Sequence, residues 1–441
     1  MRFSTCLFVS TLFFFATAAT AAGHAKSTYS FSGDVDLKSV GFLQTLAPNV
    51  NEQLYQIDLH LTEEGRLGEN VKFIGKFDYL ADPANKSSVE RNFIDLPEAN
   101  VKWRTQQFLF KAGSDIYTWG VTDGVNPIDL INVRNYYDPI HSKKLGATGL
   151  SANMIFGWFE LDAIYIPSTR SPMLPGSNSR WLPRTNYYSS SASQTSRYIL
   201  PSQFGYIFKT LPELDDARLH NVAVRLQAHL PELEMALYGY DGIAPLPIIT
   251  PVVSGAALQL SPIYVVQADA DVELDLQDYR QQTGGASFVK TLGAWQIKGE
   301  STWAQPHAHA TANESWSTVS VFELEKSWNT GADSTLTTIL QYATSRQAVA
   351  LSNGVNSLSH FFDSNWMAGG HFSWRDKDSF SFFYSHDVIL HAWLSDLKYE
   401  RRLNDDFMLG VGATLLGGPE NSPLGAFAKN KNINLEAKYN F

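Results

Sequence analysis

The chain ends in a stretch, residues 433–441, in which apolar and polar side chains alternate strictly. Because successive side chains of a β-strand point to opposite faces, this pattern predicts a strand with one apolar and one polar face. A half-buried strand of a soluble protein has the same pattern, but this one carries Tyr439 and closes on Phe441. Aromatic residues at strand ends are typical of transmembrane β-barrels, so we predict a membrane-spanning strand.

The same alternation recurs along the whole chain, for example over residues 29–37, 71–79 and 295–303. Turns rich in glycine, asparagine and aspartate separate the segments, and short connections alternate with long ones. The tenth segment is the least regular, within residues 276–290, and the longest connections cover residues 167–214 and the region after Asp241. We predict an all-β fold, an antiparallel transmembrane barrel of about eighteen strands with short periplasmic turns and long extracellular loops.

The N-terminal segment has the features of a secretory signal peptide. Arg2 precedes an apolar run, and the stretch from Ala19 to Ala22 supplies the small residues of a cleavage site. We predict a signal peptide over residues 1–22 and an outer-membrane barrel over residues 23–441. Cys6 is the only cysteine, so the mature chain is expected to hold no disulfide. The formal net charge of −10 argues against a nucleic-acid partner.

Aromatic side chains on the apolar faces gather beside the short turns. Tyrosine and tryptophan favour the headgroup level of a membrane because their rings combine apolar and hydrogen-bonding parts. Core aromatics of a soluble protein would instead be scattered along the strands. We predict a periplasmic girdle that consists of Trp103, Phe108, Phe159, Trp295, Trp328, Trp374, Phe380, Tyr439 and Phe441.

Charged side chains fall on the polar faces of the predicted strands. An arginine or lysine that faced lipid would cost about 2–4 kcal/mol near the bilayer midplane, so these faces are expected to line the lumen. The two signs are mixed, which predicts a wet interior where each charge either pairs with another or contacts solute. The predicted lumen-lining residues are Lys72, Lys76, Asp78, Glu98, Lys102, Arg104, Lys111, Glu160, Asp162, Arg225, Glu234, Lys298, Glu300, Lys398 and Glu400.

The stretch from Thr118 to Tyr137 is expected to fold into the barrel and narrow its pore. Connections of this length without secondary structure are usually functional or disordered, and this one is too apolar for disorder. The alternative is a compact cap that lies over the rim. The pore-constriction candidates are Asp123, Asn126, Asp129 and Arg134. The three charged candidates are expected to project into the water path.

Two further chemistries are considered and set aside. Asp123, Asn126 and Asp129 offer oxygen ligands of the kind that calcium prefers, but their spacing matches no calcium loop and these residues are common turn formers. His307 and His309 are assigned to a surface loop. The run Ser385-His386-Asp387 has the residue types of a hydrolase triad, but neighbours on a strand point apart. We predict no metal, no cofactor and no enzymatic activity.

Several motifs resemble those of a known family. They are Trp119-Gly120, Asp123-Gly124, Asn126-Pro127-Ile128-Asp129 and Asn132-Val133-Arg134-Asn135, and further matches lie at residues 164–167, 174–177, 238–242 and 298–300. They are similar to the alginate-export-like and related uncharacterised outer-membrane porins of Gram-negative bacteria. This resemblance implies a monomeric barrel that passes an organic solute or polymer. Ser114-Asp115 stands where such proteins often have a basic residue, which argues against an alginate-like polyanion.

A closing strand that ends in phenylalanine also resembles the signal that delivers outer-membrane barrels to their assembly machinery. Tyr439 and Phe441 are therefore candidates for an assembly signal. The predicted function is a porin in the bacterial outer membrane for a small organic solute or polymer. The alternatives are a transporter of hydrophobic compounds and a non-conducting surface adhesin or structural barrel. The expected partners are outer-membrane lipid and lipopolysaccharide, the barrel-assembly machinery and the transported solute.

Overall fold

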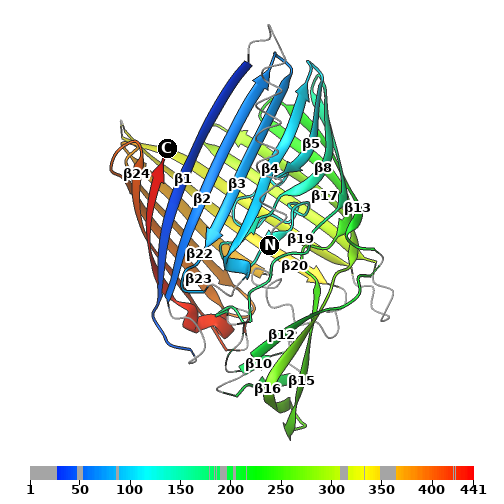
Figure 1. Ribbon diagram of the computed structural model, residues 1–441, viewed down its shortest axis with the longest axis vertical. Helices are drawn as coiled ribbons and strands as arrows, with labels where there is room; N and C mark the ends of the chain where they lie inside the picture. Colours follow the sequence, from blue (N-terminus) through cyan, green and yellow to red (C-terminus); the bar gives the residue numbers. More distant parts are fainter. Residues whose placement is uncertain are drawn as a thin grey trace.

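The chain forms a closed antiparallel β-barrel of eighteen strands in a computed structural model (Figure 1). The structure describes residues 27–46, 53–85, 89–177, 179–182, 184, 186–188, 196–201, 205–214, 216–307, 316–331, 333–347, 364–420, 422 and 424–441. The first strand, β1 (Ser27–Phe42), pairs with the last, β25 (Asn432–Asn440), and closes the ring. The predicted fold class is confirmed. The predicted signal peptide lies outside the described residues.

The remaining barrel strands follow one another around the ring in chain order. They are β2 (Gln53–Leu67), β3 (Val71–Ala81), β4 (Phe93–Arg104), β5 (Phe108–Asp115), β8 (Ala147–Phe156), β9 (Phe159–Ser168), β13 (Leu219–Leu230), β14 (Leu233–Ile243), β17 (Arg280–Leu292), β18 (Trp295–Pro306), β19 (Ser317–Gly331), β20 (Ser334–Gln347), β21 (Ser364–Trp374), β22 (Asp378–Asp387), β23 (Trp393–Arg402) and β24 (Phe407–Gly417). The tenth of them, irregular in sequence, is β17.

Large apolar side chains cover the outside of the barrel. Leu150, Leu237 and Leu435 are 57%, 61% and 60% exposed, which a lipid-covered wall permits and a water-covered wall would not favour. Beside the short turns, aromatic rings pack in pairs: the ring centroids of Trp103 and Phe110 lie 5.5 Å apart. Alternation along the strands therefore separates a lipid-facing wall from a lumen-facing wall, as the sequence pattern predicts.

Two long connections form a second sheet that the sequence analysis missed. It contains β10 (Asn186–Tyr188), β11 (Ser196–Ile199), β12 (Gly205–Thr210), β15 (Ile248–Gln259) and β16 (Tyr264–Gln277). This sheet lies beyond the loop end of the barrel, at the bottom of Figure 1. Because β11 and β12 pair in parallel with β16, which follows far along the chain, no local pattern indicates these contacts. The prediction of loops alone in these regions was wrong.

The other connections follow, with one exception, the predicted alternation of short and long connections. One outer connection, residues 388–392 between β22 and β23, is short rather than long. None of the helices in the described ranges is long and apolar enough to cross a membrane. The connection between β5 and β8 contains only two short strands, β6 (Arg134–Asn135) and β7 (Lys143–Lys144), and it leads to the candidate site.

Candidate functional site

The inner segment, which we define as residues 116–146 between β5 and β8, lies inside the barrel. Its tip, residues 121–127, is held by hydrogen bonds from backbone N–H groups to side chains of the opposite wall. Thr122 donates to Glu300 Oε1 (2.7 Å), Asp123 to Glu323 Oε2 (2.8 Å) and Val125 to Gln341 Oε1 (2.9 Å). These acceptors lie in the middle of β18, β19 and β20. The tip therefore lies at mid-strand depth and not above the rim.

Apolar packing explains why the inner segment follows the inner wall formed by β9, β13 and β14. Its Trp119, Ile128 and Ile131 are buried together with Ile164 and Ala223, which point inward from β9 and β13. Tyr238 of β14 also contacts the segment, with its ring centroid 5.8 Å from that of Trp119 and its hydroxyl donating to the Trp119 carbonyl (3.1 Å). Apolar residues on an inward face would otherwise contact water, so the segment and the wall shield each other.

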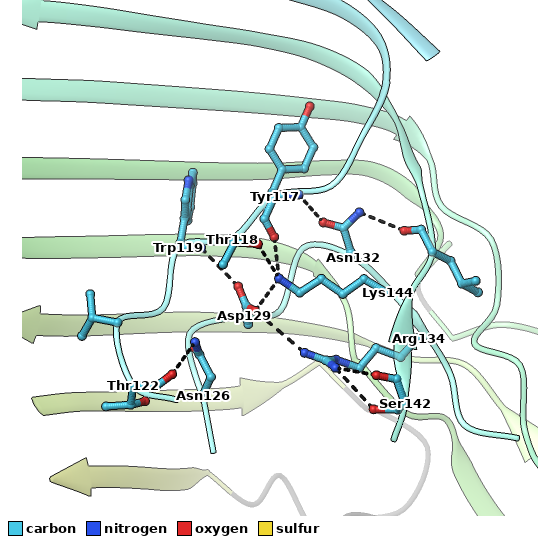
Figure 2. Close-up of polar contacts among 12 residues, drawn as sticks. Tyr117, Thr118, Trp119, Thr122, Asn126, Asp129, Asn132, Arg134, Ser142 and Lys144 are labelled. Carbon is cyan, nitrogen blue, oxygen red and sulfur yellow. Dashed lines mark hydrogen bonds and ion pairs between the residues drawn. The ribbon is translucent and has the colours of Figure 1, made fainter. Parts of the chain in front are cut away.

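A buried asparagine holds the base of the inner segment together. Figure 2 shows Asn132 beside Tyr117, whose backbone N–H donates to Asn132 Oδ1 (2.7 Å). Asn132 Nδ2 donates to the carbonyls of Asp115 and Leu145, both at 2.9 Å. One side chain thus joins the start, middle and end of the segment, and buried polar groups satisfied in this way fix a single conformation.

The expectation that Asp129 projects into the water path is contradicted. Its side chain is 6% exposed, pairs with Lys144 and accepts a hydrogen bond from the Trp119 N–H (3.1 Å), as Figure 2 shows. Arg134 lies 3.8 Å from Asp129 and donates to Ser142. The apolar sequence of the segment indicated that it packs on the barrel wall. It did not indicate which of the charged side chains would become buried by that packing. Asp129 is a structural residue of the segment.

Two of the constriction candidates, Asp123 and Asn126, lie at the tip. The Asp123 side chain is 51% exposed, and Lys298 donates to its Oδ2 (2.7 Å). Asn126 donates to the carbonyl of Thr122 (3.3 Å) and so closes the turn of the tip. Burial favours the neutral carboxyl, but hydrogen bonds from the groups around it lower the pKa of Asp123 below its ordinary value. Asp123 is therefore charged at neutral pH and faces the lumen.

The second half of the inner segment crosses to another part of the wall. His141 Nδ1 lies 2.9 Å from Asp138 within the segment, and its Nε2 lies 3.3 Å from Asp396 of β23. Lys143 lies 3.3 Å from Asp58 of β2. Burial alone would lower the pKa of His141, but the charges and hydrogen bonds of the two carboxylates raise it to about 10. A protonated His141 thus bridges the segment and the wall.

Three carboxylates surround one ammonium beneath the tip. Lys298 Nζ lies 2.7 Å from Asp123, 3.0 Å from Glu323 and 2.6 Å from Glu325. The three acids lie close enough together to hold a metal ion, but the lysine already occupies the space between them. Of the calcium candidates only Asp123 belongs to this group. We call Asp123, Glu323, Glu325 and Lys298 the acidic group, since its net charge is negative.

A row of basic side chains lies on the opposite wall. Cross-strand register places Arg66 beside Lys72, Lys72 beside Lys102, and Lys102 beside Lys111 on β2 to β5. Glu64 and Asp115 each pair with one of them at 2.7 Å, so the row keeps a net positive charge. Like charges directly opposite one another, as these are, destabilise a sheet. We call Arg66, Lys72, Lys102 and Lys111 the basic row. Arg104 follows Lys102 toward the short turn.

Most other predicted lumen-lining charges pair with neighbours on adjacent strands. The pairs are Lys76 with Glu98 (2.5 Å), Asp78 with His60 (2.7 Å), Arg225 with Asp162 (2.5 Å) and Glu160 (3.5 Å), His229 with Glu234 (3.7 Å), and Lys398 with Glu400 (2.7 Å) and Glu436 (3.1 Å). Such pairs stiffen the wall between the basic row and the acidic group.

Several residues of this site were missed in the sequence. Glu323 and Glu325 alternate with outward Phe322 and Leu324, so the period-two pattern already carried the signal that they face inward. Gln341 and Tyr238 gave no such signal, because nothing in a single strand shows that it contacts a distant loop. His307 donates its N–H to Arg280 at the outer end of the barrel, whereas His309 lies outside the described residues. Ser385 donates to Asn365 on the neighbouring strand.

Comparisons with known proteins identify the fold. No protein-family model and no curated protein matches the chain. Among solved structures, OccK2 (OpdF) of Pseudomonas aeruginosa matches with a TM-score of 0.50 and 11% identity, over 94% of this chain and 98% of that one. A BenF-like porin from Pseudomonas fluorescens Pf-5 matches with a TM-score of 0.50 and 11% identity, over the same 94% and 98%. The chain has the fold of an outer-membrane porin, and we place it in a bacterial outer membrane.

Proposed function

We propose that this protein is a passive channel for small polar organic solutes, with the inner segment as its constriction. The observation that carries the proposal is the anchoring of the tip on Glu300, Glu323 and Gln341 at mid-strand depth. A segment held there occupies part of the lumen on the side of β9 to β20. At that depth the remaining path lies along β1 to β5 and β21 to β25, where Lys76 and Glu64 are 40% and 38% exposed. Nearer the outer end, it passes beside His141 and Lys143, which cross to Asp396 of β23 and Asp58 of β2.

The charges around this path favour a solute that carries a dipole. The basic row lies on β2 to β5 and the acidic group on β18 and β19, on opposite sides of the ring. The basic row lies near the short turns, and the acidic group extends from mid-strand depth toward them. A low-dielectric wall strengthens such a field, so a solute with a carboxylate at one end and a cationic or hydroxyl group at the other is oriented as it passes.

A polymer is a weaker candidate. The resemblance to alginate-export-like porins would imply a polyanion, yet a long anionic chain would have to pass the exposed carboxylate of Asp123. Transport of hydrophobic compounds would need an apolar path, whereas the exposed lumen groups are charged. We therefore propose small solutes with mixed polar groups.

Planar-bilayer conductance and liposome swelling test the proposal. We expect the refolded barrel to form channels, and to admit an amino acid faster than an uncharged sugar of similar size. Replacing residues 121–127 by two glycines should raise single-channel conductance, because it removes the tip but keeps the base held by Asn132. As a control, shortening the hairpin of β15 and β16, which lies in the second sheet, should leave conductance unchanged. A folded, heat-modifiable barrel without conductance or swelling would overturn the proposal in favour of an adhesin or structural barrel.

A further inference from the structure

The lipid-facing wall carries a lysine held between two indole rings. Lys326 of β19 shares the outward face with Phe322 and Trp328, and cross-strand register places it beside Trp295 of β18. Its Nζ lies 4.4 Å from the ring centroid of Trp295 and 3.4 Å from that of Trp328. Trp295 begins β18 directly after a short turn, so the ammonium lies at the headgroup level of the periplasmic leaflet.

This lysine differs from two other outward basic groups near the short turns. Lys290 lies 3.3 Å from Glu232, and Arg401 lies 3.8 Å from Asp378. Within the described part of the chain, no carboxylate forms an ion pair with Lys326. Cation–π contacts orient an ammonium but leave its N–H donors available for an anion. The geometry thus presents an oriented, uncompensated positive charge at the level where lipid phosphates lie.

An apolar groove begins on the same two strands. Its volume is about 770 Å³, and its lining includes Phe322 and Gly299 of β19 and β18 together with Met235, Leu237, Ala286 and Phe288. Phe322 lies four positions from Lys326 along β19, about 13 Å in an extended strand. The lining includes the small residues Ala286 and Gly299, and the Phe288 ring lies over Gly299. Since this wall faces hydrocarbon and not water, the groove fits an acyl chain.

We propose that Lys326, Trp295, Trp328 and this groove form a binding site for one anionic glycerophospholipid of the periplasmic leaflet. The phosphate accepts hydrogen bonds from the Lys326 ammonium, and one acyl chain lies along Phe322 and Ala286. The two indoles hold the ammonium in place, so less side-chain freedom is lost when the lipid binds. The site is separate from the lumen, and it does not depend on the proposed channel function.

Native mass spectrometry of the barrel in a non-ionic detergent tests this site, with long-chain phosphatidylglycerol as the probe. Lys326→Met should weaken binding about fivefold, which corresponds to about 1 kcal/mol for one lysine near a membrane surface. Ala286→Phe, which fills the groove without changing charge, should also weaken binding. Lys290→Met is the matched control, because that lysine pairs with Glu232, and it should bind as the wild type does.

Competitors separate the possible ligands. Glycerol phosphate should not displace the lipid, since it lacks the acyl chain, and a neutral diacylglycerol should compete only weakly, since it lacks the phosphate. Equal binding by wild type and Lys326→Met would overturn the proposal. So would displacement by glycerol phosphate, which would indicate a site for free phosphate. An oligomer that Ala286→Phe disperses, with no lipid bound to the wild type, would show instead that the groove is an interface between copies.

Discussion

Gly33 and Phe441 exchange two backbone hydrogen bonds at the seam of the barrel. The N–H of Gly33 donates to the carbonyl of Phe441 (2.9 Å), and the N–H of Phe441 donates to the carbonyl of Gly33 (2.8 Å). A Cβ atom on Gly33 would lie 2.6 Å from the Phe441 ring, so that ring covers the glycine. The last residue of the chain thus takes part in closing the ring.

Deleting Phe441 should lower the amount of heat-modifiable barrel in the outer membrane. The deletion removes both hydrogen bonds to Gly33 and the ring that covers it. The end of the closing strand β25 therefore loses its contact with Gly33 of β1. Phe441→Tyr keeps the backbone and an aromatic ring and serves as the control, with wild-type levels expected. Unchanged levels of the deletion variant would show that neither closure nor assembly depends on this residue.

Asp129→Asn should loosen the inner segment while the barrel stays folded. Removing one partner of a buried ion pair costs about 3 kcal/mol or more, and Lys144, 13% exposed, would lose its carboxylate. We expect trypsin to cleave the folded protein after Arg134 or Lys144 at least tenfold faster. A tenfold rate ratio corresponds to a free-energy difference of about 1.4 kcal/mol. Asp123→Asn, at the exposed tip, should keep wild-type resistance. Equal resistance of both variants would mean that Asp129 does not hold the segment.

The bridge from His141 to Asp396 should open only in alkaline solution. The pKa of His141 is raised to about 10, above its ordinary value, so the protonated form is the one that the folded protein stabilises. This contribution is fully present below the ordinary pKa and is lost as the pH rises through about 10. We expect excess noise in single-channel current to appear in that range. Because lysines and tyrosines also titrate there, the readout is the difference from His141→Gln, and parallel behaviour of the two proteins would contradict the bridge.

The two walls of β23 and β24 should react differently with a thiol reagent. Leu409 is 42% exposed on the outer wall, whereas Lys398 points inward and pairs with Glu400 and Glu436. In a chain with Cys6→Ser, we expect a membrane-impermeant maleimide to label Lys398→Cys in intact membranes and to leave Leu409→Cys unlabelled. Labelling of Leu409→Cys alone would reverse the assignment of inside and outside.

The walls of this barrel could be predicted from the sequence because each strand meets lipid on one face and water on the other. That difference acts on every residue locally, so alternation alone places Leu435 outside and Glu436 inside. The contacts that build the site are not local. Val125 meets Gln341 and His141 meets Asp396 across hundreds of chain positions, and no pattern near either residue indicates its partner. The same is true of β12 and β16 in the second sheet.

Neutralising the two sides of the lumen should shift ion selectivity in opposite directions. Lys102 lies at the centre of the basic row, between Lys72 and Lys111, so Lys102→Gln weakens the positive side and should make the channel more cation-selective. Asp123→Asn weakens the acidic group and should make it more anion-selective. Each change removes one charge near the path, so we expect reversal potentials in a salt gradient to move by a few millivolts. The shift should be larger at low salt, where screening is weaker. Glu234→Gln, which lies on β14 outside both groups, is the matched control. If both variants shift selectivity in the same direction, or neither differs from the control, the opposed charges do not govern the path.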